Sequence, residues 1–298
     1  MAASPLTLPV APGRPTRLFV ALALVYLIWS STYFALRVVV TELPPFLSGG
    51  ARYFIAGVVL LAIQRARCAP MPTVRQWLWA IPIGALLFAI GNGLVASAER
   101  TIASGIAAVV CGTTPLWAGV VGPAFGAPAT RREWLGMALG FAGVVVLSLG
   151  DDLSGDPLAA ALLLLAPIGW AVGSLWSRKL PLAEGASGAA AQMITGGAVM
   201  FALAPLAGES IPTSVSWGPI LALGYLIVFG SLIAFSAYHY VLANARPALA
   251  MSNSYVNPVL ALGLGAMLGA EHIGAEVLLA TALIAGAVVL LVRGRARS

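Results

Sequence analysis

The sequence predicts an all-α polytopic membrane protein with ten transmembrane helices, arranged as two five-helix halves of inverted topology. Three observations support this fold class. Sixty per cent of the 298 residues are apolar and only 9% are charged, whereas a soluble globular chain carries roughly 25% charged residues. The apolar residues gather in ten runs with short polar segments between them. The pattern of residues 103–150 returns in residues 246–293.

The composition also excludes several classes of protein. The formal net charge of +6 does not indicate nucleic-acid binding, because the basic residues lie between apolar runs rather than on one face. Cys68 lies in a basic loop and Cys111 in the middle of an apolar run. Two cysteines placed in this way do not make a disulfide framework.

The ten apolar runs have the length of membrane spans, since about 20 helical residues cross the hydrocarbon layer. The predicted spans are 18–36, 46–63, 77–97, 102–123, 133–149, 157–176, 188–206, 217–241, 248–268 and 274–292. The segments between them are too short to connect separate soluble domains.

The charges predict the orientation of these spans. Basic residues prefer the cytoplasmic side of a membrane. With a cytoplasmic N-terminus, 13 of the 16 basic residues lie on the inner side: Arg14, Arg17, Arg65, Arg67, Arg75, Arg131, Arg132, Arg178, Lys179, Arg246, Arg293, Arg295 and Arg297. Eight of the ten acidic residues then lie on the outer side: Glu42, Glu99, Asp151, Asp152, Asp156, Glu209, Glu271 and Glu276. Both termini are therefore expected to be cytoplasmic.

The internal repeat divides the chain. A shift of 143 positions aligns Pro115 with Pro258 and Gly143 with Gly286, and a shift of 141 aligns Trp29 with Trp170. We expect a tail at 1–17, a first half at 18–150, a second half at 151–292 and a basic tail at 293–298, with both tails cytoplasmic. Five helices in each half give the halves opposite orientations, which is typical of secondary transporters that work by alternating access.

Three prolines are candidates for helix kinks or gates. A proline inside a helix removes one backbone hydrogen bond, and the freed carbonyl needs a protein or water partner within the membrane. We expect Pro115 and Pro258, which follow Thr114 and Asn257, to line a cavity. For Pro167, a gating kink and a kink that only shapes the bundle are equally compatible with the sequence.

Polar and aromatic side chains at middle depth supply the candidate cavity. Asn253 and Asn257 lie one helical turn apart and share a face. They bind either another helix or a polar substrate. For His239, a structural hydrogen bond between helices and a functional role are equally compatible with the sequence. The full candidate set for substrate binding is Tyr33, Asn92, Thr114, Trp117, Trp170, Ser174, Tyr238, His239, Asn253 and Asn257.

Missing motifs narrow the function further. The sequence contains no G-x-x-x-x-G-K-[ST], H-E-x-x-H or G-x-S-x-G motif, so we expect neither direct use of ATP nor enzymatic activity. No catalytic residue, metal site or cofactor is expected. Since no Asp or Glu falls at mid-depth in a span, facilitated transport is favoured over proton antiport by an intramembrane carboxylate. Coupling through His239 or a surface carboxylate is the alternative.

Small residues predict how the last helices of the two halves pack. Gly136 and Gly140 are spaced four residues apart in 133–149, as are Ala282 and Gly286 in 274–292. Such pairs allow close contact between helices, most simply between these two. We expect a monomer, with a homodimer through the same face as the alternative.

Several of these motifs together resemble a known family. The segment from Trp29 to Arg37, Arg52-Tyr53-Phe54, the pairs Thr114-Pro115 and Asn257-Pro258, and Gly-x-x-Gly with Val-Val-Leu are similar to the EamA repeat of the drug/metabolite transporter (DMT) superfamily. The resemblance covers the whole chain as two units and is greatest to bacterial ten-helix exporters of the YddG/YedA type.

The resemblance implies a basket-shaped bundle with a central cavity formed by its first, third, fourth, sixth, eighth and ninth helices. It also implies export of amino acids, aromatic ones included, and related small metabolites across the bacterial inner membrane. The four-helix multidrug members depend on a glutamate in their first helix. Ser30, Ser31 and Tyr33 stand in that helix here, so their proton-coupled mechanism is not carried over.

Two other functions stay open at this stage. One is export of drugs or sugar-linked substrates, as in other branches of the superfamily. The other is a membrane scaffold or sensor that transports nothing, although such a protein would not need matched kinks in inverted halves. The expected partners are a small-molecule substrate and the lipid bilayer, without nucleic acid.

Overall fold

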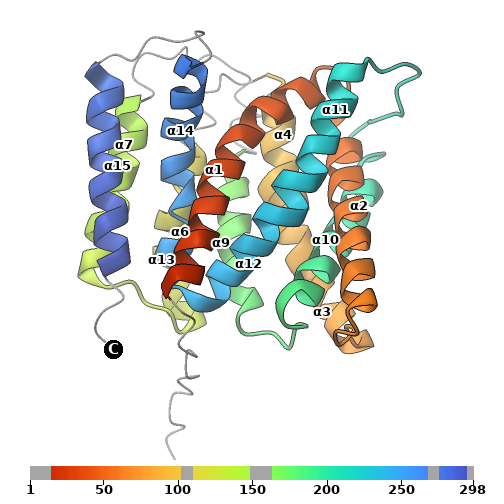
Figure 1. Ribbon diagram of the computed structural model, residues 1–298, viewed down its shortest axis with the longest axis horizontal. Coiled ribbons are helices and arrows are strands. Elements are labelled where there is room, and N and C mark those ends of the chain that lie inside the picture. Colours follow the sequence, from red (N-terminus) through yellow and green to blue (C-terminus); the bar gives the residue numbers. More distant parts are fainter. Residues whose placement is uncertain (1–14, 102–109, 148–162, 268–274, 294–298) are drawn as a thin grey trace, which may run out of the picture.

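The computed structural model describes residues 15–101, 110–147, 163–267 and 275–293, and within these ranges all regular structure is helical (Figure 1). The predicted starts of the spans at 102, 157 and 274, and the predicted ends at 149 and 268, lie outside the described residues. The all-helical class predicted from the sequence is confirmed for the described part of the chain.

Five helical stretches in the described ranges are long and apolar enough to cross a membrane. They are Thr16–Val40, Pro45–Ala66, Val74–Ala98, Gly185–Leu203 and Trp217–Asn244. Each coincides, within a few residues, with one of the predicted spans at 18–36, 46–63, 77–97, 188–206 and 217–241. A shorter apolar helix, Leu278–Val292, lies within the predicted span 274–292.

Two of the long stretches change their helical geometry midway. The third span consists of α3 (Val74–Gly84), the π-helix η1 (Ala85–Gly93) and α4 (Leu94–Ala98). The stretch at the predicted eighth span consists of α11 (Trp217–Tyr225), the π-helix η3 (Leu226–Ile233) and α12 (Ala234–Asn244). The other helices are α1 (Pro15–Val40), α2 (Pro45–Ala66), α6 (Thr114–Val121), the 3₁₀ turn η2 (Gly122–Phe125), α7 (Arg131–Leu147), α9 (Leu165–Ser177), α10 (Gly185–Leu203), α13 (Pro247–Ala250), α14 (Asn253–Met267) and α15 (Ala275–Arg293).

The predicted span 248–268 is not one continuous helix, which corrects the sequence-based boundary. The helix divides between α13 and α14 at Met251 and Ser252, well before Pro258. The Ser252 hydroxyl donates to the carbonyl of Leu249 at 2.7 Å and meets the hydroxyl of Tyr26 at 2.6 Å. Side-chain bonds of this kind compete with the backbone ladder of a helix.

At Pro115 the helix is interrupted close to the predicted position. Residues 110–112 are helical, Thr113 is a turn residue, and α6 begins at Thr114. Pro115 has no N–H to offer the carbonyl four residues earlier. The Thr114 hydroxyl donates to that carbonyl, on Cys111, at 2.7 Å, so the side chain beside the proline replaces the lost backbone bond.

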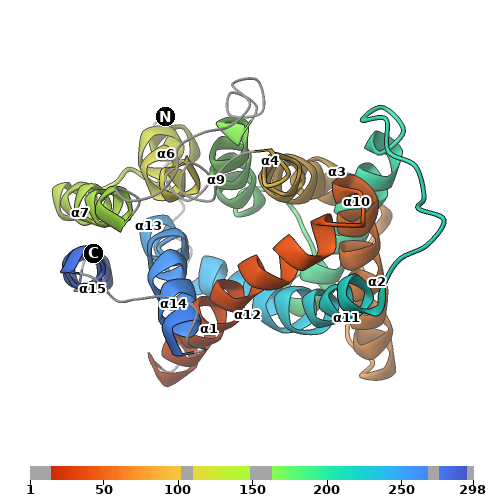
Figure 2. The same cartoon turned by 90° about the horizontal axis from the view of Figure 1, so that it is seen from above.

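Seen from above, the described helices surround a central region (Figure 2). The pair α7 and α15 packs at one end, and the pair α2 and α10 packs at the other. Between these pairs, α14, α1 and α12 follow one side, whereas α6, α9 and the third span follow the other. Residues from both halves of the sequence therefore face the same interior.

Small residues allow the end pairs to pack closely. The predicted contact between the fifth and tenth spans is confirmed: a Cβ added to Gly143 would lie 2.7 Å from Ile284, and one added to Gly286 would lie 3.2 Å from Leu139. Gly140 instead meets the ring of Tyr255 on α14. The α2–α10 contact is as close, since a Cβ on Gly197 would lie 2.6 Å from the backbone nitrogen of Phe54.

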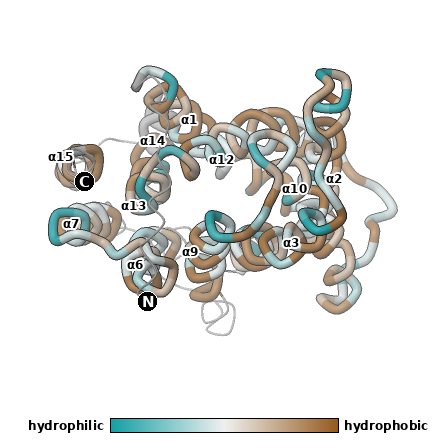
Figure 3. The backbone as a smooth tube through the Cα atoms, turned by 90° about the horizontal axis from the view of Figure 1, so that it is seen from below, coloured by the Kyte–Doolittle hydropathy of each residue, from teal (hydrophilic) through white to brown (hydrophobic). Residues whose placement is uncertain are grey.

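One end of the bundle carries basic residues. The start of α1 and the turns after α2, η2, α9 and α12 lie at the lower end in Figure 1. The basic residues at these helix ends are Arg17, Arg65, Arg67, Arg131, Arg132, Arg178, Lys179 and Arg246. Seen from that end, hydrophilic positions gather in the turns and hydrophobic positions run along the helices (Figure 3).

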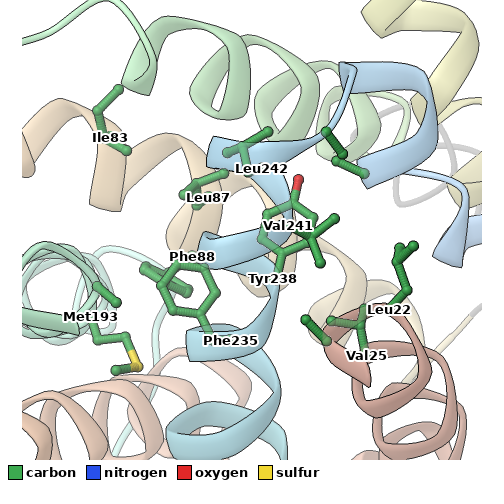
Figure 4. Close-up of a cluster of buried hydrophobic side chains, with 14 of the residues drawn as sticks. Leu22, Val25, Ile83, Leu87, Phe88, Met193, Phe235, Tyr238, Val241 and Leu242 are labelled. Carbon is green, nitrogen blue, oxygen red and sulfur yellow. The ribbon is translucent and has the colours of Figure 1, made fainter. Parts of the chain in front are cut away.

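The interior core joins helices from both halves. Phe88 of η1 packs against Tyr53 of α2 and Phe235 of α12, with ring centroids 4.2 Å and 4.9 Å apart respectively. Figure 4 shows Phe88 and Phe235 with Leu22 and Val25 of α1, which belong to the same buried cluster. The outer helix faces are also apolar, as at Leu27, which is 61% exposed. Lipid would cover such faces, because the bilayer core is itself apolar.

Candidate functional site

The central region contains a cavity whose walls come from both halves of the sequence. Side chains of α1, α2, η1, α4, α6, α9, η3, α12 and α14 line it. Six of the thirteen residues predicted for binding or gating are among the lining residues: Asn92, Thr114, Pro167, Trp170, Asn253 and Asn257.

Two tryptophans form an aromatic wall of the cavity. Trp29 and Trp170 meet edge to face, with ring centroids 5.6 Å apart and planes at 80°. The Trp29 indole N–H donates to the carbonyl of Gly230 at 3.0 Å, and that of Trp170 donates to the Tyr238 hydroxyl at 2.9 Å. These bonds fix the orientation of both rings.

Tyr238 and Ser174 support this wall from behind. Both side chains are buried, and neither is among the lining residues. Their hydroxyl oxygens lie 2.9 Å apart. Ser174 therefore fixes the position of the Tyr238 hydroxyl, which accepts the hydrogen bond from the Trp170 indole. The structure therefore gives these two predicted residues a supporting place rather than a place in the cavity wall.

The remaining predicted residues do not line the cavity. His239 approaches the side chain of Gln192 on α10, with 3.4 Å between its Nε2 atom and the amide nitrogen, which corresponds to the structural alternative. Trp117 packs near Ala171 and Met251 in a separate apolar cluster. Pro115 and Pro258 belong to helices that reach the cavity but are not lining residues themselves. The side chain of Tyr33 lies outside the described residues.

The amide pair of α14 lies in the cavity wall as expected. Asn257 is 2% exposed, and its Oδ1 atom accepts a long bond of 3.4 Å from the Ser30 hydroxyl. Asn253 is 7% exposed, and its Oδ1 atom has no hydrogen-bond partner in the described structure. A buried carbonyl oxygen without a donor is costly, so this atom is a candidate acceptor for a bound molecule.

The two π-helices bring backbone carbonyls to the same region. They begin at Ala85 and Leu226, which are 141 residues apart, the same shift that aligns Trp29 with Trp170. In η3 the carbonyl of Gly230 accepts from Trp29, and in η1 that of Leu87 accepts from the Asn92 side chain at 3.0 Å. π-Helical segments are rare and occur frequently at functional sites. The hydropathy pattern gives no sign of them.

Sequence reasoning missed Arg52 as a member of the site. The sequence signal that identifies it is an arginine within the apolar span 46–63, since intramembrane charges usually have a function. Arg52 is 7% exposed, lines the cavity, and donates from Nε to the hydroxyl of Ser231 at 2.9 Å.

One carboxyl group lies just beyond the third span. Glu99 follows α4, and its Oε2 atom is buried without a hydrogen-bond partner in the described structure. Burial raises the pKa of this carboxyl group to about 7, although the charge of Arg37 opposes the shift. The sequence left proton coupling through a surface carboxylate open as an alternative without naming a residue, and Glu99 is instead a buried carboxyl group at the end of the predicted third span. Within the described residues, no three His, Cys, Asp or Glu side chains form a group able to hold a metal ion.

Comparisons with known proteins agree with this architecture. The model of the EamA-like transporter family matches twice, at residues 17–149 and 157–293. The chain is 43% identical over 279 residues to the Escherichia coli (strain K12) "uncharacterized inner membrane transporter YedA", covering 93% of this chain and 91% of that protein. It is 24% identical over 269 residues to the "uncharacterized transporter YoaV" of Bacillus subtilis, covering 87% and 91%.

A solved crystal structure shares the fold. It superimposes with a TM-score of 0.75 over 94% of this chain and 99% of the other, at 22% identity. Since both family matches together cover nearly the whole sequence and one relative is 43% identical, the chain belongs to the EamA-like transporter family.

Proposed function

We propose that this protein exports amino acids, aromatic ones included, and related small metabolites across the bacterial inner membrane by alternating access. The observation that carries the proposal is the cavity between the two halves, where the Trp29–Trp170 wall and the amides of Asn253 and Asn257 border one space. Indole faces suit aromatic or aliphatic side chains. Amides suit the polar end of a zwitterion.

The proposed topology is ten helices in two inverted five-helix units, at 18–150 and 151–292, with cytoplasmic termini. The two-fold match of the family model and the basic helix ends at one end of the bundle support it. The names of relatives such as YedA and YoaV support transport, and the former supports the inner membrane.

We further propose that transport is facilitative. Within the described residues, the cavity wall contains no carboxylate, and a proton antiporter usually depends on one within the membrane. Glu99, just outside the third span, is the group through which proton coupling would act if this part of the proposal is wrong.

Purified protein in liposomes tests the proposal directly. Uptake of radiolabelled amino acids is measured without an imposed ion gradient, beside liposomes that carry the Asn253→Ala/Asn257→Ala double variant. Uptake by the wild type alone supports facilitated amino-acid transport. Uptake that requires a pH gradient would overturn the facilitative part, and no uptake under either condition would overturn the substrate class.

Drug export is the second candidate, because the rings of Trp29, Trp170, Phe88 and Phe235 all line the cavity. A cationic drug such as ethidium, tested in the same liposomes, separates the two. Uptake of ethidium without uptake of any amino acid would favour the drug transporter.

A further inference from the structure

The cavity wall has a formal positive charge without a matching negative one. Of the described lining residues, Arg52 alone carries a formal charge at neutral pH. Its side chain is 7% exposed on α2. The described structure contains one ion pair, between Arg246 and Glu133 at the basic end of the bundle. Arg52 therefore has no carboxylate partner in the part of the chain that the structure describes.

The guanidinium group is held in place but is not neutralised. Its Nε atom donates to Ser231 at 2.9 Å, and its Cζ atom lies 4.7 Å from the ring centroid of Tyr53. Gly230 makes room for it, since a Cβ there would lie 2.7 Å from Nη2. An arginine has five N–H donors, so four remain on Nη1 and Nη2 after the bond to Ser231.

A buried charge of this kind calls for a counter-ion. Burying an unpaired charge is expensive, and charged residues inside membranes usually pair with one another or mark a substrate pathway. Two parallel N–H groups of a guanidinium match the two oxygens of a carboxylate. Because the described walls supply no carboxylate, a carboxylate of the transported molecule is the partner that suits this group.

A second, independent group faces the same cavity. Asn253 on α14 is 7% exposed, and its Oδ1 atom accepts no hydrogen bond within the described structure. An ammonium group donates three hydrogen bonds and accepts none, so it suits this oxygen. The cavity thus provides free donors on a cation at α2 and a free acceptor at α14.

We infer that Arg52 binds the carboxylate of the transported molecule and that Asn253 Oδ1 accepts a hydrogen bond from its ammonium group. This inference rests on the proposed function and deepens it, because it makes a free carboxylate the required chemical group. The apolar part of the substrate then lies against Trp29 and Trp170. Amino-acid amides and amines, which lack the carboxylate, are poor ligands.

Binding to purified protein tests the inference. The intrinsic tryptophan fluorescence of the protein, to which Trp29 and Trp170 contribute, is titrated with three ligands. They are phenylalanine, phenylpropionate, which keeps only the carboxylate, and phenylalaninamide, which keeps only the ammonium group. The wild type should bind both carboxylates at least tenfold more tightly than the amide. Arg52→Gln should weaken binding of the carboxylates by about 30-fold or more, as expected when one member of a buried charge pair is removed, and leave the amide unchanged.

Two control variants distinguish the effect of the Arg52 charge on binding from a structural role of its side chain. Arg65→Gln removes an exposed charge from the same helix and should leave all three affinities unchanged. Ser231→Ala keeps the charge of Arg52 but removes its orienting bond, so it should weaken the carboxylates much less than Arg52→Gln does. Equal losses in these two variants would mean that Arg52 only braces α2 against η3, and would overturn the inference.

The wild-type measurement also distinguishes this inference from the proposed function. Equal binding of phenylalanine and its amide overturns the role of Arg52, whether or not amino acids are transported and whether or not the variants fold. Binding of phenylpropionate without any binding or uptake of amino acids keeps the role of Arg52 and overturns the amino-acid substrate. If no carboxylate binds, the role of Arg52 is overturned.

Discussion

Trp29 and Trp170, which the internal repeat makes equivalent, meet edge to face in the structure, with ring centroids 5.6 Å apart. Two residues 141 positions apart in the sequence thus form one contact at the cavity wall. Such a contact is expected where a pseudo-two-fold axis passes between two halves, since equivalent residues near the axis approach each other. The two π-helices are equivalent under the same shift, because their starts are also separated by 141 residues.

The indole N–H of Trp170 should matter for transport. In Trp170→Phe the Tyr238 hydroxyl loses the donor now 2.9 Å away and keeps only Ser174. A lost hydrogen bond costs about 1 kcal/mol, so we expect roughly a fivefold fall in the uptake rate in liposomes. Trp217→Phe is the matched control, because Trp217 is 76% exposed and away from the cavity. Equal rates in both variants would contradict this role.

The amide pair of α14 gives a stronger prediction. Asn253→Ala and Asn257→Ala should abolish uptake while the protein keeps its yield and its elution volume in size-exclusion chromatography. The reason is that both side chains line the cavity and Asn253 has an unused acceptor. Thr41→Ala, at an exposed turn after α1, serves as the control. Unaltered uptake by both asparagine variants would remove them from the site.

The carboxyl group of Glu99 predicts a pH-dependent stability. Its pKa is raised from about 4.5 to about 7, chiefly by burial, so the folded state binds its proton more tightly than the unfolded state does. The contribution of the Glu99 carboxyl group to the free energy of unfolding is fully present below about pH 4.5 and is lost as the pH rises through 7. Arg37 on α1 and the thiol of Cys111 are the other titratable groups near this carboxyl group.

Glu99→Gln should therefore flatten this part of the profile. The free energy of unfolding of the variant should rise relative to that of the wild type by about 1 to 3 kcal/mol towards pH 8, since one pKa unit corresponds to about 1.4 kcal/mol. Apparent melting temperatures in detergent, measured from pH 5 to pH 8, should report this as a difference that grows with pH. Glu184→Gln, at an exposed carboxylate, should follow the wild-type profile. A constant difference between Glu99→Gln and the wild type across the range would show that Glu99 does not titrate there.

The contact between α2 and α10 should be sensitive to one methyl group. In Gly197→Ala the new Cβ would lie 2.6 Å from the backbone nitrogen of Phe54, so the helices must separate. Overpacking of this kind costs about 1 to 3 kcal/mol, and thermal unfolding in detergent should report it as a lower melting temperature. Gly224→Ala, on α11 with no atom within 4 Å of the added Cβ, should not lower it. Similar melting temperatures would refute the close contact.

The sequence by itself determined the class of fold and much of the architecture. Apolar runs of about 20 residues have to be helices in a membrane, because only internal hydrogen bonds can satisfy the backbone there. Five of the ten predicted spans recur as long apolar helices within the described residues. The pair Gly136 and Gly140 predicted the α7–α15 contact, in which Gly136 takes part, since a Cβ added there would lie 3.1 Å from Leu291. The position of Asn253 and Asn257 on one face follows from helical periodicity alone, and the cavity includes both.

Only the tertiary structure decided which polar side chains face the cavity and which support it. His239, Trp117, Ser174 and Tyr238 lie at suitable depths in their spans, but their directions depend on how helices from the other half pack against them. The hydropathy of a sequence indicates how deep a residue lies along a membrane span. It does not indicate in which direction the side chain points around the helix axis, because that direction depends on the local helical geometry. The π-helices shift that direction midway through two spans, and side-chain bonds such as that of Ser252 break a third. Arg52 became recognisable as a site residue for the same reason, because its missing counter-charge is a property of its neighbours in space.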